Sequence, residues 1–404
     1  MTYKTLSLAV AILCTAAACV ETSARKPAPE AIAGVAAPYG IQSNDHFIRH
    51  WGDKLTLNGI GGGTLGDYAE RIQTTHADQI KRNGVIKLSM LALSGGGPDG
   101  AYGAGLLNGW TARGDRPEFS TVTGVSTGAI IALFAFLGPE YDQKLEEVYT
   151  QYRTDQLIET TFSSALAGGS AVTNTDGYRG LVAKYVDEDV MRRLRNTAKA
   201  GRTLLVGTTN LDAARPAIWN ITGIAATNHK DAERLVEDVI LASSAIPGIF
   251  PPVLIPVVGA SGAVYDEMHV DGGATQQVML FSPGYQLGRV DSAVGTPVER
   301  TLYVVMNNKL KKPYRPVEPR LIPIASAAAS SLLGGSGAGD IYKIFTIAQR
   351  DGIDLNVMAV PSDFSVESTE VFDPAYIKAL YQLGYEIGLK GENWSDLPPG
   401  FVAD

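Results

Sequence analysis

The sequence predicts an α/β domain, a three-layer α/β/α sandwich around a mainly parallel sheet. Three observations lead to this expectation. Apolar runs of β type alternate with helical patterns along the chain, which is typical of parallel strands joined by crossover helices. Glycine-rich stretches follow the first two of these strands, as expected where a strand turns sharply into a helix. With 404 residues, 45% of them hydrophobic, the chain is long enough to bury a large core.

The charge of the chain narrows the classes of partner. Its formal net charge is −8, whereas a protein that binds nucleic acid needs a basic face for the phosphate backbone. We therefore expect no nucleic-acid partner.

The first eighteen residues have the layout of a secretory signal peptide, which is removed from the mature protein. Lys4 is followed by an apolar run at residues 6–18, which is too short to span a bilayer comfortably. Cys14 and Cys19 are the only cysteines of the sequence. The domain that follows them is therefore expected to have no disulfide and no cysteine-based metal site.

Cys19 also indicates how the mature protein is held. The small residues at positions 16–18 resemble the cleavage box of bacterial lipoproteins, in which the cysteine becomes the lipidated N-terminus. The expected product is an exported cell-envelope protein, anchored to a membrane on the periplasmic or outer-membrane side. The alternative is cleavage at an ordinary small-residue site, with Cys19 incidental.

The order of segments after the signal peptide follows from composition. Residues 19–45 are rich in alanine and proline, which is typical of a tether rather than of a packed element. We expect the folded domain at residues 46–390, with its motifs between residues 85 and 280. Residues 391–404 are expected to form a C-terminal tail.

A glycine-rich loop follows the first expected strand, at residues 85–93. The loop SGGGPDG, residues 94–100, contains G-x-G-x-x-G, the pattern of a dinucleotide-binding turn. Such a site needs an acidic residue at the end of the next strand to hold the ribose, but Asp115 and Glu118 precede that strand, at residues 119–123. The Lys and Ser or Thr of a phosphate loop are missing after the last glycine as well. A nucleotide site is therefore not expected.

A serine-containing turn closes the second expected strand. The turn GVSTG, residues 124–128, is followed by an apolar run at residues 129–137 that predicts a buried helix. G-x-S-x-G between a strand and a helix is typical of a nucleophile elbow, in which a sharp turn exposes the serine hydroxyl. A side chain at either glycine would clash in so tight a turn. Ser126 stands at the helix N-terminus, where the backbone dipole favours a developing anion, and is the expected nucleophile.

Next to such a nucleophile, the glycine loop can serve a different function from nucleotide binding. Hydrolysis of an ester needs preorganised N–H donors for the tetrahedral oxyanion. Gly95, Gly96 and Gly97 have no side chains to screen their amides, and Pro98 has no amide to offer. The loop is therefore better interpreted as an oxyanion hole than as a nucleotide cradle.

Candidates for the base lie further along the chain. A strand is expected at residues 202–209. The uncharged segment at residues 239–265 contains four prolines, which exclude a membrane helix there. Asp271 follows, directly before two glycines. His229 and His269 are the histidines that come after Ser126, as the order of an α/β-hydrolase triad requires of its histidine.

Four motifs in this order resemble the patatin-like family of lipid acyl hydrolases. They are SGGGPDG at residues 94–100, GVSTG at 124–128, ASSAIPGIFPP at 242–252 and VDGG at 270–273. The resemblance implies the patatin-like α/β/α fold and hydrolysis of a fatty-acyl ester or phospholipid, as a phospholipase A, lysophospholipase or esterase.

The resemblance also implies a Ser–Asp dyad without histidine. Ser126 would be the nucleophile, Asp271 the base and Gly95–Gly97 the oxyanion hole, with an acyl-enzyme intermediate and with no metal or cofactor. This chain departs from the family at Asp99, where members often carry Arg or Lys, so cationic help at the oxyanion or headgroup is in doubt.

Two alternatives remain at this stage. One is an α/β-hydrolase esterase with a Ser-His-Asp triad. In a strand His269 would share the face of Asp271 and could reach the site, but we expect it to support Asp271 rather than to shuttle the proton, and His229 to matter less. The other is a surface lipoprotein that binds lipid without turnover.

The remaining segments complete the expected fold. A strand is expected at residues 300–306, a mobile loop over the site or an inert linker at residues 325–339, and a docking helix at residues 372–391. Prolines and apolar residues at 246–258 are expected either to line the acyl site or to belong to the core.

Overall fold

The structure, a computed structural model, describes most of the chain. The described residues are 25–53, 65–151, 159–160, 173–174, 176–281, 284–310, 314, 316–370 and 372–398. The expected signal peptide, with Cys14 and Cys19, lies outside the described residues.

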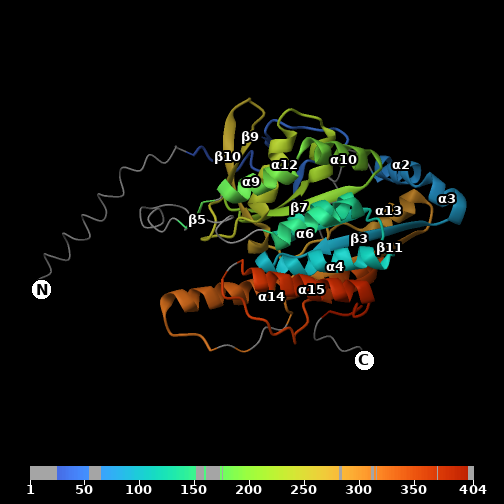
Figure 1. Cartoon of the computed structure of the whole chain (residues 1–404). Helices are drawn as coiled ribbons and strands as arrows, with labels where there is room; N and C mark the ends of the chain where they lie inside the picture. Colours follow the sequence, from blue (N-terminus) through green and yellow to red (C-terminus); the bar gives the residue numbers. More distant parts are fainter. Residues whose placement is uncertain are drawn as a thin grey trace, which may run out of the picture.

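A single large sheet runs through the centre of the molecule (Figure 1). Its strand order is β1-β9-β10-β7-β4-β3-β11-β12, and β8 pairs with β7 and β2. The middle of the sheet, from β7 to β12, is parallel, whereas the strands beyond β7 are antiparallel. The strands of this sheet are β1 Ala37–Pro38, β2 Arg49–Trp51, β3 Ile86–Leu93, β4 Thr121–Val125, β7 Thr203–Asn210, β8 Arg215–Asn220, β9 Val253–Val258, β10 Val264–Asp271, β11 Val298–Met306 and β12 Asp354–Ala359. A separate pair is formed by β5 Glu159–Thr160 and β6 Thr173–Asn174.

Helices cover both faces of the sheet, so the expected three-layer α/β/α fold is confirmed. On β3, Leu91 and Leu93 face a core shared with helices α4, α5 and α15, while Met90 and Ala92 face a second core shared with α13 and α14. The helices are α2 Leu65–Thr75, α3 Ala77–Asn83, α4 Gly100–Arg113, α5 Thr127–Leu137, α6 Asp142–Thr150, α9 Asp176–Tyr185, α10 Glu188–Lys199, α11 Ile221–Ala226, α12 Ala232–Ser243, α13 Leu287–Val294, α14 Leu321–Asp351 and α15 Pro374–Lys390, with the 3-10 turns η1 Gly97–Asp99, η2 Pro139–Tyr141 and η3 Gly272–Ala274. Because both faces are buried there, the second half of β3, from Met90 to Leu93, is apolar without alternation, whereas Lys87 near its start is exposed.

The expected C-terminal docking helix is α15, and it packs unusually close to α4. A Cβ atom added at Gly105 would lie 2.0 Å from the Tyr381 carbonyl oxygen, and one added at Gly384 would lie 2.2 Å from that of Tyr102. Glycine is therefore required at this crossing, where the two backbones touch. The contact fixes α4, which begins directly after the glycine loop.

The expected tether at residues 19–45 is partly wrong. From residue 25 the chain lies against the antiparallel end of the sheet, because β1 pairs with β9 and Arg25 forms an ion pair with Asp212. Ile41 is 2% exposed. Alanine and proline still allow such packing because an edge strand needs few hydrogen bonds and tolerates proline.

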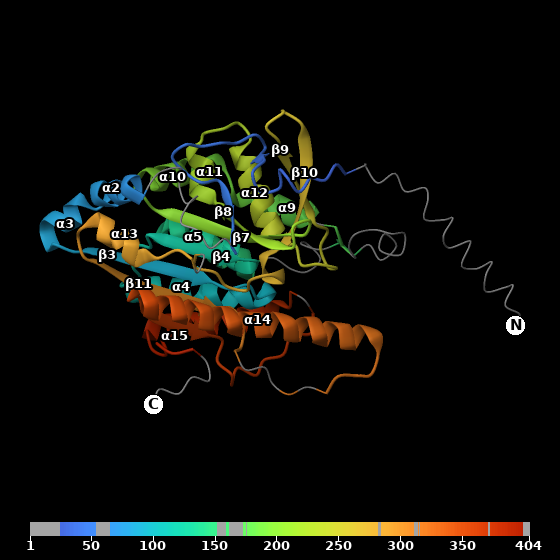
Figure 2. The ribbon, with the colours of Figure 1, turned by 180° about the vertical axis from the view of Figure 1, so that it is seen from behind.

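The expected loop at residues 325–339 is a helix, part of the 31-residue α14. Its alanine, serine and leucine sustain a helix, and a Cβ atom added at Gly337 would meet Gln277 at an ordinary packing distance of 3.5 Å. Figure 2 shows the N-terminal half of α14 extending beyond the body of the molecule. Among the described residues no helix, α14 included, combines the length and apolar character that crossing a membrane would need.

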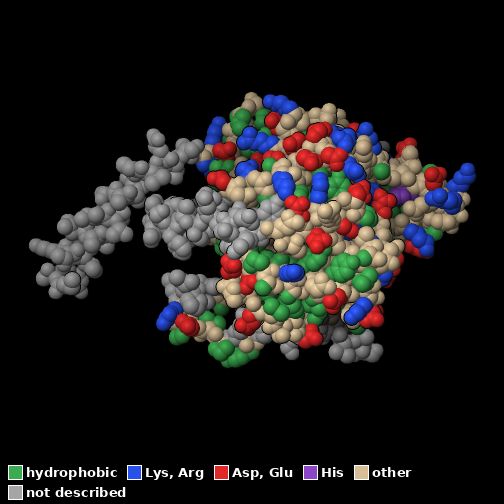
Figure 3. Space-filling view, in the orientation of Figure 1, with side chains coloured by type: hydrophobic (Ala, Val, Ile, Leu, Met, Phe, Trp, Pro, Cys, Tyr) green, Lys and Arg blue, Asp and Glu red, His purple; other side chains and the backbone are tan. Residues whose placement is uncertain are grey.

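On the face in Figure 3, basic and acidic groups are interspersed across the upper part, and hydrophobic side chains are more frequent across the lower half.

Candidate active site

Ser126 occupies a strained turn between β4 and α5. Its φ of 57° and ψ of −131° are rare for a residue with a side chain, and such strain is concentrated at functional positions. The flanking glycines are needed, as expected from the sequence. A Cβ atom at Gly124 would lie 2.3 Å from the Gly128 carbonyl oxygen, and one at Gly128 would lie 2.6 Å from that of Leu93.

Asp271 reaches Ser126 because β4 and β10, which lie on opposite sides of β7, end at adjacent positions of that strand. The parallel strand β4 ends with Val125 opposite Gly207, and the antiparallel strand β10 ends with Asp271 opposite Thr208. Adjacent positions of β7 therefore hold the ends of both strands. The side chains of residues 145 positions apart in the chain become neighbours.

The hydroxyl of Ser126 donates a hydrogen bond to Asp271, with 2.7 Å between Oγ and Oδ2. The other carboxyl oxygen, Oδ1, accepts a hydrogen bond of 2.7 Å from the Gly273 amide. Burial raises the pKa of Asp271 to about 6, against the smaller lowering effects of these two hydrogen bonds. A carboxylate with this pKa is ionised at neutral pH and is a stronger base than an ordinary aspartate.

The segment between the elbow and the aspartate holds both of them. Ser243 accepts a hydrogen bond from the Ser126 amide and donates one to the Gly207 carbonyl. The carbonyl of Ala245 accepts one from the Asp271 amide. Sequence reasoning gave Ser243 no role. Its place in the ASSAIPGIFPP run could have drawn attention to it.

The glycine loop lies beside Ser126, and only part of it has free donors. The Gly95 amide already donates to the Gln277 carbonyl at 2.9 Å. The amides of Gly96 and Gly97 donate to none of the described residues, and Gly97 lines the same cavity as Ser126. Of the three amides expected to form an oxyanion hole, that of Gly95 is therefore already engaged, while those of Gly96 and Gly97 are left without a partner among the described residues.

Asp99, which stands where the family often has a cation, has a structural partner. It accepts a hydrogen bond of 2.6 Å from the Tyr376 hydroxyl. This bond ties the turn after the glycine loop to the first turn of α15. Asp99 therefore stabilises the docking of a helix.

A largely apolar cavity of about 70 Å³ opens at Ser126. Its polar lining groups include the hydroxyls of Tyr149, Tyr178 and Ser244. The whole lining is Gly97, Pro98, Ser126, Thr127, Ile130, Val148, Tyr149, Tyr178, Leu181, Ser244, Ile246, Phe250, Phe372 and Ile377. Of the expected acyl-site segment 246–258, only Ile246 and Phe250 contribute, while Val253, Ile255 and Val257 are core residues.

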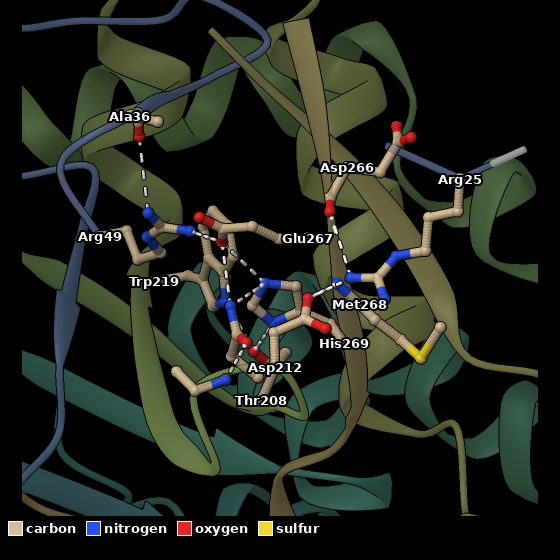
Figure 4. A network of polar contacts seen from close by, with 12 residues as sticks. Arg25, Ala36, Arg49, Thr208, Asp212, Trp219, Asp266, Glu267, Met268 and His269 are labelled. Carbon is tan, nitrogen blue, oxygen red and sulfur yellow. Dashed lines mark hydrogen bonds and ion pairs between the residues drawn. The ribbon is translucent and has the colours of Figure 1, made fainter. Parts of the chain in front are cut away.

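His269 lies in a network of polar contacts that includes Thr208 and Glu267 (Figure 4). Its ring contacts Thr208 at 2.9 Å through Nδ1 and Glu267 at 3.2 Å through Nε2. Glu267 in turn forms an ion pair with Arg49. Burial lowers the pKa of His269 below its usual value, which favours the neutral ring.

His229 also forms its hydrogen bond away from Ser126 and Asp271. Its Nδ1 accepts a hydrogen bond of 3.2 Å from the Asp231 amide. Neither His229 nor His269 forms a hydrogen bond with Ser126 or Asp271, so the serine hydroxyl meets a carboxylate directly.

Residues 91–280 match the family model described as patatin-like phospholipase. The matched range begins in β3 and ends after Asp271, and it includes the glycine loop and Ser126. Among curated proteins no match was found.

Thirteen chains of solved structures also match. One is the crystal structure of VipD from Legionella pneumophila, with 12% sequence identity and a TM-score of 0.37. The match covers 75% of this chain and 66% of the VipD chain, slightly less than two thirds of its length.

Proposed function

Because residues 91–280 are a patatin-like phospholipase domain, a family of lipid acyl hydrolases, we propose that this protein is a serine carboxylic ester hydrolase with a Ser126–Asp271 dyad. Its substrate is a fatty-acyl ester, as in a phospholipid or lysophospholipid. The observation that carries the proposal is the 2.7 Å hydrogen bond from Ser126 to Asp271 at the mouth of an apolar cavity.

The geometry supports a two-step mechanism. Asp271 takes the proton of the Ser126 hydroxyl while Oγ attacks the ester carbonyl, and the oxyanion is held by the amides of Gly96 and Gly97. The tetrahedral intermediate collapses, the proton passes from Asp271 to the leaving alcohol, and an acyl-enzyme remains. Water then attacks the acyl carbonyl while Asp271 takes its proton, and Asp271 returns that proton to Oγ of Ser126 as the Oγ–acyl bond breaks, which releases the fatty acid and restores both residues.

The dyad is favoured over a triad by the position of the base. In a triad the serine hydroxyl bonds to a histidine, which a carboxylate then orients. Here Ser126 bonds to the carboxylate itself, and the hydrogen bonds of His269 go to Thr208 and Glu267.

A labelling experiment tests the proposed nucleophile. A fluorophosphonate probe is expected to label the wild-type protein and the control variant Ser120→Ala. Among the described residues, the Ser120 hydroxyl bonds only to the Ser89 carbonyl. Ser126→Ala is expected to lose the label. Hydrolysis of phospholipid, lysophospholipid and short-chain ester is then measured in the same three proteins. A labelled Ser126→Ala protein, or a wild type that hydrolyses none of these substrates, would contradict the proposal.

We also propose that the protein is an exported lipoprotein anchored to a membrane of the cell envelope through Cys19. The support is the sequence of residues 1–19, an apolar run and small residues before the cysteine. In cell fractionation, Cys19→Ser is expected to move the protein from the membrane fraction to the soluble fraction. Cys14→Ser is the matched control and is expected to stay with the membranes, and retention of the Cys19→Ser protein would reject the anchor.

A further inference from the structure

The cavity at Ser126 shares a wall with a second cavity in the helical layer. The second cavity measures about 20 Å³. Ile130 of α5, Val148 of α6 and Leu181 of α9 line both cavities. These three side chains, here called the neck, lie between the cavity at Ser126 and the second cavity.

The second cavity can take only an apolar ligand. Beyond the neck its lining is Leu133, Phe134, Val182, Tyr185, Val186 and Ile240. The one polar group among these side chains, the Tyr185 hydroxyl, lies 3.5 Å from the Nζ atom of Lys184, whose side chain is 52% exposed, so it is directed toward the surface. A polar ligand group would lose its hydration in this cavity without gaining a partner.

One face of α5 connects the two cavities. Ser126 caps the helix, Ile130 follows four residues later, and Leu133 and Phe134 follow one turn beyond. Side chains at this spacing lie on the same face of a helix. From Ser126 to Phe134 the helix rises by about 12 Å, which an extended chain of about ten methylene groups would span.

We propose that the second cavity binds the distal part of the fatty acyl chain, which passes the neck along α5 from an ester carbonyl at Ser126. The inference rests on the proposed acyl hydrolase function and assigns its chain-length specificity. Acyl chains of about ten carbons or more reach the second cavity, whereas shorter chains fill only the first. Each added methylene that becomes buried is worth up to about fourfold in kcat/KM.

Two variants in the second cavity test the assignment in opposite directions. Val182→Phe fills the cavity and is expected to lower the ratio of kcat/KM for p-nitrophenyl laurate to that for the butyrate by about tenfold or more, the worth of two methylenes. Leu133→Ala enlarges the cavity and is expected to raise the palmitate-to-laurate ratio. Thermal unfolding of each variant shows that it is folded.

Val290→Phe is the matched control for overpacking. Val290 is fully buried against the other face of the sheet and lines neither cavity, so its variant is expected to lose stability and to keep the wild-type chain-length ratios. The inference is overturned if the folded cavity variants keep those ratios, or if Val290→Phe changes them as strongly. If Val182→Phe does not fold, Leu133→Ala decides alone. A wild type that hydrolyses no ester of the series would instead reject the proposed function.

Discussion

Asp271 and Glu267 are two buried carboxyl groups on the same strand, β10. Their surroundings suit one of them for catalysis and the other for stabilising the fold. They are four residues apart and so lie on the same face of the strand. The side chain of Glu267 is 1% exposed and the Asp271 residue is 5% exposed. Burial alone would raise the pKa of both.

Because the two carboxyl groups have different hydrogen-bond and charge partners, their pKa values are shifted in opposite directions overall. At Glu267 the effect of burial is outweighed by the hydrogen bond from His269 and the charge of Arg49, which lower the pKa to about 2. At Asp271 only hydroxyl and amide donors are present, and the pKa stays at about 6. A carboxylate paired with a cation is too weak a base to take a serine proton, whereas one without a cation in an apolar site is poised for it.

The sharpest test of this comparison is removal of the groups at the Asp271 end. Ser126→Ala and Asp271→Asn are each expected to lower kcat by about 10³-fold or more, because either change removes the nucleophile or its base. Glu267→Gln is the matched control, since it removes a buried carboxylate from the same strand. It is expected to lower the unfolding temperature while the folded protein retains activity. Near-normal turnover in the folded Asp271→Asn protein would rule out the dyad.

The next largest effect is expected in the glycine loop. Gly96→Ala is expected to lower kcat by about 10²-fold, the cost of one oxyanion donor. A Cβ atom at Gly96 would lie 2.0 Å from the Asn307 carbonyl oxygen, so the loop must shift away from its place. At Gly97 the same atom meets open space.

Gly97→Ala therefore serves as the control, although its φ of 57° costs about 1 kcal/mol with alanine. It keeps the amide in position and is expected to retain more activity than Gly96→Ala. Equal rates for wild type and Gly96→Ala would show that the loop only packs.

The pH dependence is a further test, with opposite signs at the two carboxyl groups. Because Asp271 must be ionised to act, kcat/KM is expected to rise about tenfold per pH unit below pH 6 and to level off above it. Its pKa of about 6 lies above the ordinary 3.8, so the folded state binds this proton more tightly than the unfolded state. The resulting loss of stability is absent below pH 3.8 and complete above pH 6, where it reaches about 3 kcal/mol.

Asp271→Asn should consequently raise the unfolding temperature at pH 8 and leave it almost unchanged at pH 4. For Glu267 the sign is reversed. Its pKa is lowered from 4.5 to about 2, so its stabilisation is complete above pH 4.5 and is lost as the pH falls to 2. An Asp271→Asn protein that is less stable than the wild type at pH 8 would contradict the assignment of Asp271 as a buried, unpaired charge.

Local sequence motifs predicted those parts of the site that depend on the shape of the backbone. The elbow around Ser126 and the turn after Asp271 could be predicted because tight turns require glycine at fixed positions. The hydrogen bond between the two residues could be expected only from the family resemblance, since it depends on β4 and β10 ending at adjacent positions on the two sides of β7. Whether these groups carry the catalysis remains a prediction.

Contacts between distant segments could not be predicted in this way. Arg49 and Glu267 are 218 positions apart, and nothing in either local sequence pairs them. The amide of Gly95 is used by Gln277, which no motif indicated. The helix α14 was missed because alanine, serine and glycine occur both in loops and in helices that pack closely, and only the neighbouring surface decides between them.

The smallest effect on activity is expected at His269, which lies between the two carboxyl groups. Thr208 accepts a hydrogen bond of 2.8 Å from the Trp219 ring, so its own proton is free to point at Nδ1 of His269, and the ring then donates from Nε2 to Glu267. The histidine thus belongs to the network of Glu267, and Asp271 shares with it only the strand and the pairing to Thr208.

His269→Gln is expected to keep kcat for a medium-chain ester within about tenfold, or about 1.4 kcal/mol. The same change should lower the unfolding temperature, because it leaves a buried carboxylate with one partner fewer. His229→Gln, at a half-buried position, is the control and should alter neither quantity. Turnover and unfolding curves of the two variants, measured at neutral pH, distinguish a Ser–Asp dyad from a triad. A loss of turnover of about 10³-fold in either folded protein would show that a histidine transfers the proton. The difference between Asp271 and Glu267 would then concern stability alone.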